Sequence, residues 1–209
     1  ILKEFGYALK RITNEKNFSL LERKLPDLCA DRIDYTLRDM VNYESVSKAD
    51  YYFNHMIIYE NEIIFDDKKS AFDFAKDYIF MDESHWANIV DISVMHTLGE
   101  AIKIALEKGI LSKEDVFKHD NFVFSKLKNS NNKEITKKID MLNPKLKIIS
   151  NPDDYDFFVR TKLRFVNPKF LGSDGKVKRA TEEYSELNNI IERHKEKTEK
   201  GHFVKIVSY

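Results

Sequence analysis

Cysteine is almost absent from the 209-residue sequence, which contains only Cys29. A single thiol excludes an internal disulfide framework and suits a reducing compartment. Free cysteines are among the most buried residues in proteins, so we interpret Cys29 as a small core side chain in preference to a catalytic nucleophile.

Long apolar segments are absent as well. The sequence has no run of about 18 apolar residues, the length that a membrane-spanning helix requires. Its first residues lack the charged-then-apolar pattern of a secretory signal. These absences, with the scarcity of cysteine, predict a cytoplasmic protein that does not enter a membrane. The first residue is Ile1 and not Met, from which we expect an upstream portion.

Net charge is the third absence, because Lys plus Arg and Asp plus Glu each number 35. This balance argues against a strongly basic nucleic-acid binder and against a polybasic membrane anchor. With 33% charged and 42% hydrophobic residues, the composition is that of an ordinary globular protein. A chain of this length can bury a substantial core.

Residues 26–42 have the spacing of an amphipathic helix. Pro26 can occupy a first helical turn, where its missing N–H is no loss. The apolar positions recur at helical intervals: Leu28, Cys29, Ile33, Leu37, Met40 and Val41. The opposite stripe is polar: Asp31, Tyr35, Arg38, Asp39 and Asn42. We therefore predict a helix with an elaborate polar face.

Further helices and a hairpin are expected downstream. Apolar residues on either side of the polar 60–62 turn predict a β-hairpin over 55–65. Asp66 or Asp67 is expected to cap a helix that runs to about residue 81. A long buried helix is predicted over 84–108, with Gly109 at its C-terminal cap.

The last third of the sequence mixes strands with helices. A helix is expected to end near Pro144, and the alternation of apolar and basic residues over 157–165 predicts a strand buried on one face. A charged helix over about 181–200 and a strand over 203–207 follow. The predicted class is mainly α, with a small β-hairpin and a C-terminal α+β element.

The polar face of the helix predicted over 26–42 contains an uninterrupted nine-residue motif: Asp31-Arg32-Ile33-Asp34-Tyr35-Thr36-Leu37-Arg38-Asp39. It resembles the D-(K/R)-x-D-Y-x-x-R-D signature of the HD-superfamily phosphohydrolases, which include the deoxynucleoside triphosphate triphosphohydrolases. In that superfamily an early His, a His-Asp pair and a late Asp bind one or two metal ions. The resemblance extends through the hairpin and through 105–115 and 174–178, so it covers most of the chain from about residue 20.

The resemblance implies a fold and a chemistry. Residues 1–145 would be the C-terminal part of an HD-type helical bundle with an inserted hairpin, and 146–209 a small α+β element. The activity would be phosphoester hydrolysis by metal-activated water. Asp31 would be a metal ligand, and the substrate-binding residues would be Arg32, Tyr35, Arg38 and Asp39. A carboxylate on a rigid helix can complete a near-octahedral site with imidazoles.

The resemblance also implies a cofactor and partners. The cofactor would be a divalent ion, and Mn, Fe, Mg, Zn and Ni all stay open. The substrate would be a phosphorylated small molecule such as a nucleotide. Because members of the superfamily often form dimers or tetramers, a homo-oligomer is a further expectation.

Histidines are missing ahead of the motif, since all six follow Asp31: His55, His85, His96, His119, His194 and His202. The His119-Asp120 pair stands in a polar stretch and in the wrong order relative to Asp31, so we interpret it as a surface loop or helix cap. We therefore expect the sequence to hold one ligand of a metal site, with the others outside it, and to be inactive by itself.

One stretch, residues 77–86, departs from the superfamily pattern, and another, residues 160–164, allows more than one interpretation. Residues 77–86 are acidic and aromatic where the triphosphohydrolases have Arg, His and Lys, which argues against a triphosphate substrate. We interpret His85 and Trp86 there as capping or core residues. The alternating Arg160, Lys162 and Arg164 fit either a phosphate-binding or subunit-facing stripe or, as we favour, the solvated face of an edge strand.

The alternative to an enzyme is a non-catalytic binding or oligomerisation module derived from a degenerate HD domain. Zero net charge and abundant apolar helical faces are compatible with such a module. Nucleic-acid binding is a weaker third hypothesis, because the charge balance and the motifs do not support it.

Overall fold

The computed structural model describes residues 1–14 and 16–209 with their side chains. The chain divides into two compact units, each built from two separate stretches. Unit 1 comprises Ile1–Ser84 and Leu163–Lys197, and unit 2 comprises His85–Lys162 and Thr198–Tyr209. The predicted class, mainly α with small β elements, is confirmed. The division into 1–145 and 146–209, which concerns the extent of a family domain, stays a prediction.

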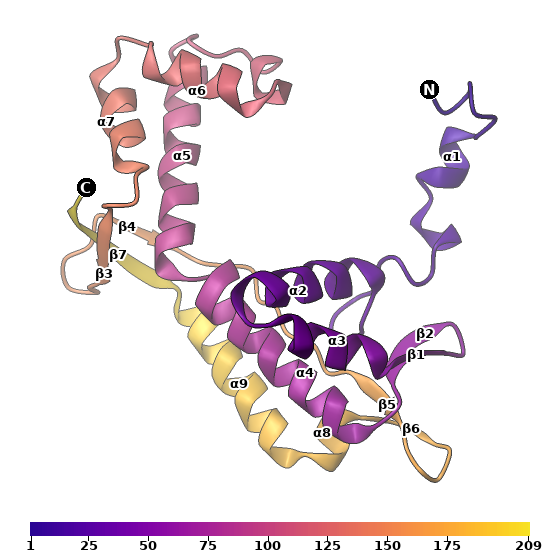
Figure 1. Ribbon diagram of the computed structural model, residues 1–209. Helices are drawn as coiled ribbons and strands as arrows, with labels where there is room; N and C mark the ends of the chain where they lie inside the picture. The colour runs from indigo at the N-terminus through magenta and orange to yellow at the C-terminus, as the bar shows by residue number, and fades with distance from the viewer. The chain divides into compact units, whose positions relative to one another are not determined.

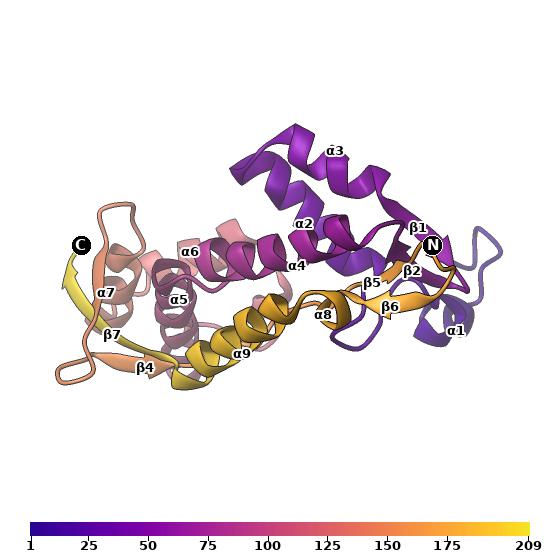
Figure 2. The same cartoon turned by 90° about the horizontal axis from the view of Figure 1, so that it is seen from below.

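The α-helices of unit 1 are α1 (Leu9–Ile12), α2 (Ala30–Tyr43), α3 (Val46–Asn54), α4 (Lys68–Met81), α8 (Ala180–Glu183) and α9 (Ser185–Lys200). Its sheet has the order β1-β2-β5-β6, from strands β1 (Met56–Tyr59), β2 (Glu62–Phe65), β5 (Lys169–Leu171) and β6 (Val177–Arg179). The β1–β2 and β5–β6 pairs are antiparallel, whereas β2 and β5 are parallel through Phe65 and Phe170. Figure 1 and Figure 2 show these strands side by side, with α4 leading away from β2.

The hairpin and the helix that follows it confirm the prediction from local sequence. Glu60 and Asn61 have φ values of 45° and 64°, the left-handed conformations that a tight two-residue turn between twisted strands requires. Asp67 is the N-cap of α4, and its carboxylate accepts hydrogen bonds from the backbone N–H groups of Lys69 and Ser70. The turn residues and the cap thus fix where the hairpin reverses and where α4 begins.

The core of unit 1 lies between α2, α3, α4 and β2. Its largest buried side chains include Met40, Phe65, Phe74 and Tyr78, and the ring centroids of Phe65 and Phe74 are 5.4 Å apart. Burial of each such side chain contributes about 2 kcal/mol to folding. The core therefore fixes the buried side of α2 and leaves its polar face outward.

Helix α2 begins later than predicted, at Ala30 and not at Pro26. The preceding loop has its own backbone hydrogen bonds, from Asp27 N–H to Lys24 and from Ala30 N–H to Leu20. Cys29 is extended at the N-cap position, with φ at −150°. The prediction that its thiol is buried is confirmed, because its exposed fraction is 0%.

Unit 2 contains α5 (Ile89–Glu107), the 3₁₀ turn η3 (Asp115–Phe117), α6 (Asp120–Lys128) and α7 (Lys133–Met141). These helices pack on one another around a shared apolar cluster: Ala101, Ile104, Ala105, Leu111, Leu127, Ile135 and Ile139. A three-stranded antiparallel sheet has the order β3 (Lys147–Ser150), β7 (His202–Ser208), β4 (Phe157–Val159). The last strand of the sequence is therefore the central one.

Three further predicted elements differ from the structure. The strand predicted over 157–165 ends at Val159, because its partner β7 begins at His202 and offers nothing to pair beyond that point. The helix predicted over 84–108 starts at Ile89, after a π-helical turn, η2 (Asp82–Trp86), and the N-cap Asn88. The helix predicted over 181–200 is divided at Tyr184 into α8 and α9. No helix in the described part of the chain has the length and apolarity to cross a membrane.

Candidate functional site

Asp31 lies in the first turn of α2, and its side chain is exposed. Its backbone N–H donates to the carbonyl of Leu21 at 3.3 Å, which ties the start of the helix to the preceding loop. A carboxylate in a first turn is stabilised by the helix dipole. Tyr35 lies four residues further on and therefore on the same face of α2.

Arg32 is engaged with the loop that precedes α2. Its Nη1 donates to the carbonyl oxygen of Asp27 at 3.1 Å and to Cys29 Sγ at 3.0 Å. Its Nη2 pairs with Glu22 Oε1 at 3.0 Å. In this conformation the guanidinium holds the loop that leads to Asp31, and its part in substrate binding stays a prediction.

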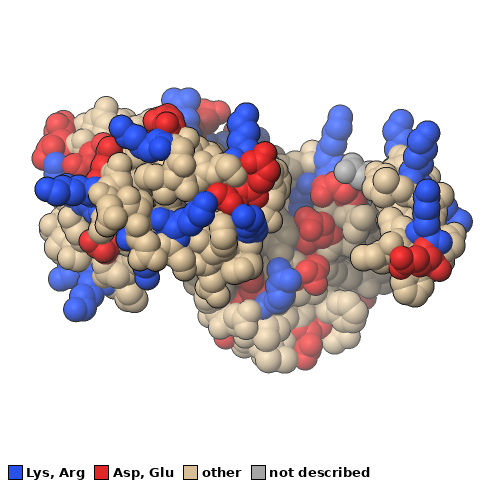
Figure 3. Space-filling view, turned by 90° about the horizontal axis from the view of Figure 1, so that it is seen from above, with Lys and Arg blue, Asp and Glu red and all other residues tan. Residues whose placement is uncertain are grey.

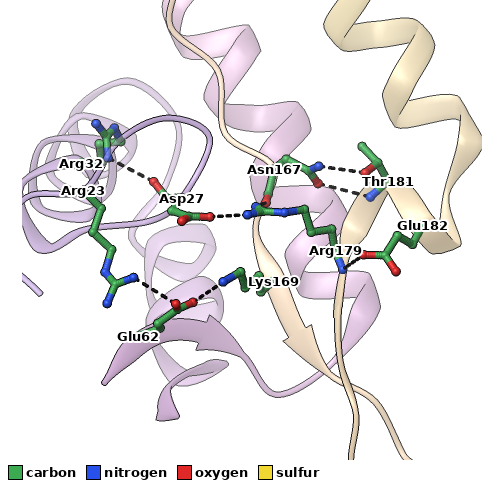
Figure 4. A network of polar contacts seen from close by, with 9 residues as sticks. All are labelled: Arg23, Asp27, Arg32, Glu62, Asn167, Lys169, Arg179, Thr181 and Glu182. Carbon is green, nitrogen blue, oxygen red and sulfur yellow. Dashed lines mark hydrogen bonds and ion pairs between the residues drawn. The ribbon is translucent and has the colours of Figure 1, made fainter. Parts of the chain in front are cut away.

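A second arginine fastens the same loop from the C-terminal side of unit 1 (Figure 4). Arg179 Nη2 lies 2.7 Å from Asp27 Oδ1, and its Nη1 donates to the carbonyl oxygen of Asn167 at 2.8 Å. The backbone N–H of Asn167 in turn donates to the carbonyl of Pro26 at 2.9 Å. Asp27 and Arg179, which are 152 positions apart in the sequence, therefore position the start of α2 together.

Glu62 completes the network drawn in Figure 4. Its carboxylate is 3.0 Å from Arg23 Nη1 and 2.5 Å from Lys169 Nζ. The hydrogen bond from Lys169 is the main cause that lowers the pKa of Glu62. The carboxylate joins the hairpin to β5 and, through Arg23, to the loop ahead of α2.

Tyr35 connects the polar face of α2 to α4. Its hydroxyl forms a hydrogen bond with the hydroxyl of Tyr78, which is buried. Burial raises the pKa of Tyr35, while the hydrogen bond from Tyr78 and the charges of Arg32 and Arg164 act to lower it. Burial, reinforced by the bond to Tyr35, also raises the pKa of Tyr78. Both phenols are therefore neutral near pH 7, and one of the two O–H groups donates to the other.

The π-helical turn at the end of α4 turns Asp82 inward, where only 1% of its side chain is exposed. Arg164 Nη1 lies 3.4 Å from Asp82 Oδ1, and His194 Nε2 lies 3.4 Å from Asp82 Oδ2. His194 Nε2 also donates to the backbone carbonyl of Arg164 at 2.9 Å, and its Nδ1 is 3.0 Å from Glu83 Oε1. Two carboxylates and one carbonyl thus surround a buried imidazole.

The surroundings of His194 favour its protonated form. Burial lowers the pKa of the imidazole, but the hydrogen bonds to Asp82 and Glu83 outweigh that effect and the net shift is upward. Lys197 Nζ binds the other oxygen of Glu83 at 2.6 Å. Tyr35 is hydrogen-bonded to Tyr78 on α4, and Asp82 follows Tyr78 by four residues. Asp31 and Tyr35 on α2 are therefore connected to the charged cluster of Asp82, Glu83, Arg164 and His194 at the end of α4.

Tyr78, Asp82 and His194 were not among the residues predicted for the site, because they come from α4, η2 and α9. The acidic and aromatic composition of 77–86 was the one signal in the sequence near them. Arg164 belonged to the predicted strand stripe, but it lies outside any strand and in unit 1, whereas Arg160 and Lys162 are in unit 2. The stripe interpretation is therefore wrong.

The other two predicted substrate-binding residues lie further along α2. Arg38 pairs with Asp34 at 3.3 Å, with both side chains mostly exposed. It lines an apolar groove of about 680 Å³ between α2, α3 and the hairpin, a different surface from the Tyr35–Tyr78 contact. Asp39 is half-buried on the same helix. The structure thus brings Arg32 and Tyr35 close to Asp31 and places Arg38 apart from them.

Metal-binding geometry is found elsewhere in unit 1. Across the described residues, one group of three ligand atoms lies within 4.8 Å, from His55, Asp66 and Asp67. His55 Nδ1 is 2.7 Å from Asp66 Oδ1 and 3.1 Å from Asp67 Oδ2, although Asp67 is also the N-cap of α4. Asp31 belongs to no such group in the same part of the chain. That a metal site at Asp31 takes its other ligands from outside this sequence stays a prediction.

Two further predictions concern the surface. His119 is exposed and is the N-cap of α6, where its Nδ1 accepts from the N–H of Phe122, so the predicted helix cap is confirmed. On the face shown in Figure 3, basic and acidic side chains alternate, and among the residues drawn in colour neither sign forms a continuous patch. The view agrees with the argument from charge balance against a basic nucleic-acid surface on that face.

Comparison with known proteins finds no matching family model and no matching solved structure. The uncharacterized protein YdhJ of Bacillus subtilis is 29% identical over 210 residues, covering 99% of this chain and 64% of its own length. The metal-dependent phosphohydrolase cns2 of Cordyceps militaris is 28% identical over 117 residues, covering 52% of this chain and 34% of its own length. The chain spans less than two thirds of either relative.

A distant and partial relative of this chain is therefore a metal-dependent phosphohydrolase. That relationship is consistent with the resemblance of the Asp31–Asp39 motif to the HD superfamily.

Proposed function

We propose that this chain is part of an HD-type metal-dependent phosphohydrolase. The observation that carries the proposal is that the motif forms one helix, α2, whose first turn exposes Asp31 with Tyr35 on the same face. The Cordyceps relative is a metal-dependent phosphohydrolase, which is the same chemical class. A divalent metal, when bound, supplies an activated water and polarises the phosphoryl group.

Each motif residue of this chain would have a role in the reaction. Asp31 supplies one oxygen ligand, and the remaining ligands come from outside the described residues, either from further chain or from a second subunit. Tyr35 presents a neutral hydroxyl, because burial raises its pKa, and can donate to a phosphoryl or sugar oxygen. Arg32, Arg38 and Asp39 are proposed to contact the substrate, a phosphorylated small molecule such as a nucleotide.

The test uses the full-length protein and the variant Asp31→Asn. We expect the variant to lose its bound divalent metal and to turn over nitrophenyl phosphates and nucleotides at least about 100-fold more slowly. Mutation of residues that only orient a metal ligand already lowers metal affinity or activity by about 10- to 100-fold. Glu186→Gln is the matched control, because Glu186 is an exposed carboxylate in the first turn of α9. Unchanged metal content and turnover in Asp31→Asn would overturn the proposal.

The group of His55, Asp66 and Asp67 needs a separate arm in the same experiment. His55→Ala removes the imidazole and leaves the capping bonds of Asp67 intact. Metal that is lost in His55→Ala and retained in Asp31→Asn would assign the binding to this group and exclude Asp31 as the ligand.

A second candidate function, a non-catalytic binding or oligomerisation module, is favoured by the apolar groove of α2, α3 and the hairpin. Val41, Phe53 and Ile58 on its rim have exposed fractions of 45%, 66% and 68%. Water-exposed apolar side chains in one groove are typical of interaction sites. If this function is the correct one, Phe53→Ser should change the sedimentation coefficient of the full-length protein, and Asp31→Asn should leave it unchanged.

A further inference from the structure

We propose that Arg164 binds the anionic group of the ligand at the Asp31 site, and that Asp82 and His194 position its guanidinium. The proposal rests on the proposed function for the location of the site and adds a residue that comes from outside the motif. It also specifies the ligand chemistry, which is a tetrahedral oxyanion such as a phosphoryl group.

The first argument is where the guanidinium lies. The side chain of Arg164 is 34% exposed, so the group reaches solvent, while Asp82 beneath it is buried. The contact of 3.4 Å between Arg164 Nη1 and Asp82 Oδ1 is longer than the roughly 2.7–2.9 Å of a strong charge-assisted hydrogen bond. Asp82 therefore holds the guanidinium from its buried side, and part of the Arg164 side chain reaches solvent.

The second argument is the set of groups around Tyr35. Tyr35 is hydrogen-bonded to Tyr78 on α4, Asp82 follows Tyr78 by four residues, and Arg164 pairs with Asp82. These contacts connect Arg164 to the phenol of Tyr35, and the charges of Arg32 and Arg164 accordingly act to lower its pKa against the effect of burial. The neutral hydroxyl of Tyr78 is hydrogen-bonded to the same group. Guanidinium and phenol groups offer N–H and O–H donors, and arginine in particular matches the geometry of phosphate oxygens. Such a set favours an oxyanion.

The third argument is the free-energy cost of burying Asp82 and His194. The side chains of Asp82 and His194 are 1% and 3% exposed, and taking charged groups out of water is expensive unless they are well paired. The turn that buries Asp82 is π-helical, a rare conformation that occurs often at functional sites. His194 Nε2 fixes the carbonyl of Arg164 at 2.9 Å, so the cluster holds both ends of that residue.

A neighbouring basic residue provides a control. Arg160 belongs to unit 2, and its guanidinium lies over the ring of Phe158 at 5.5 Å. It has the same charge as Arg164 and is four positions away in the sequence, but it comes from the other unit. A general loss of positive charge can therefore be separated from the loss of Arg164 itself.

The test measures binding of sulfate and inorganic phosphate to the full-length protein, freed of metal with a chelator, by isothermal titration calorimetry. We expect the wild type to bind both oxyanions, and Arg164→Ala to weaken binding by about tenfold or more, the equivalent of one charge-assisted hydrogen bond. Arg164→Lys should retain part of the affinity, and Arg160→Ala all of it. The divalent-metal content of Asp31→Asn is measured separately from anion binding, so a failed metal assignment is distinguishable from a failed assignment of Arg164.

The positioning role has its own readout. His194→Ala should weaken sulfate binding by about threefold, because the carbonyl of Arg164 loses its donor, and His194→Gln, whose amide can still donate to that carbonyl, should restore most of it. Circular dichroism checks that each variant is folded, and Arg164→Lys replaces Arg164→Ala if the latter unfolds. The proposal is overturned if the wild type binds neither anion, or if Arg164 variants bind as tightly as the wild type. It is equally overturned if Arg160→Ala loses as much affinity as Arg164→Ala.

Discussion

The hydroxyl of Tyr35 on α2 is hydrogen-bonded to the hydroxyl of Tyr78 on α4, and the two rings lie with their centroids 6.3 Å apart at 50°. Tyr78 belongs to the buried core, whereas Tyr35 is half-buried on the face that contains Asp31. Core packing in unit 1 thereby controls the orientation of a side chain in the candidate site.

Removing either hydroxyl should destabilise the chain by the value of one hydrogen bond. We expect Tyr78→Phe and Tyr35→Phe each to lower the free energy of unfolding by about 1 kcal/mol. The double variant should lose about as much as either single variant, since one bond is removed in all three. Urea unfolding curves test this expectation, and strictly additive losses would contradict it.

The ion pair between Arg179 and Asp27 should hold the loop ahead of α2. Arg179→Ala leaves Asp27 without this partner and is expected to cost about 1–2 kcal/mol, since the pair is partly buried and charge-assisted. Limited proteolysis within residues 19–29 should become faster in that variant. Arg193→Ala, on the exposed surface of α9, is the control and should behave as the wild type in both measurements.

The stability contributed by His194 should depend on pH. Burial opposes its protonation but the hydrogen bonds to Asp82 and Glu83 dominate, so its pKa is higher in the folded chain than in the unfolded one. A histidine whose pKa is raised on folding contributes its full stabilisation at pH values below its unfolded pKa of about 6.5. This stabilisation is lost as the pH rises through the pKa of the folded state. The melting temperature of the wild type should therefore exceed that of His194→Gln most at pH 5.5, and the difference should shrink towards pH 9. A difference that grows with pH would contradict the assigned shift.

Asp115 should show the opposite dependence in unit 2. Hydrogen bonds from Lys118 and Lys126, both at 2.7 Å, hold the pKa of its carboxyl well below the usual range. A carboxyl group whose pKa is lowered on folding stabilises the folded chain at pH values above its unfolded pKa of about 3.9. This stabilisation is lost as the pH falls through the pKa of the folded state. We expect Asp115→Asn to melt below the wild type at pH 7, with the gap closing as the pH falls below about 4. Calorimetric scans over that range measure it, and a gap independent of pH would rule out the carboxylate as the cause.

Features determined by neighbouring residues were predictable from the sequence. The hairpin needed only two apolar runs around Glu60 and Asn61, and α4 needed only a capping side chain, which Asp67 provides. Helix spacing alone placed Asp31 and Tyr35 on one face. The prediction of a strand over 157–165 was wrong beyond Val159, because strand length depends on a distant partner. Alternation in one segment does not reveal whether a partner strand extends far enough to pair with it.

The rest of the candidate site depends on tertiary packing. Tyr78, Asp82 and His194 meet Tyr35 and Arg164 only because α4, the segment after Leu163 and α9 fold into one unit. No local periodicity links residues 35, 82 and 194.

The position of β7 in unit 2 has a consequence for synthesis of the chain. This strand, His202–Ser208, pairs with β3 on one side and with β4 on the other, and β3 and β4 do not pair with each other. While the chain emerges from the ribosome, the edges of β3 and β4 therefore stay unpaired until the residues of β7 have been added. Unpaired edges are prone to associate with other chains, so translation arrested before residue 202 should yield nascent chains that depend on chaperones.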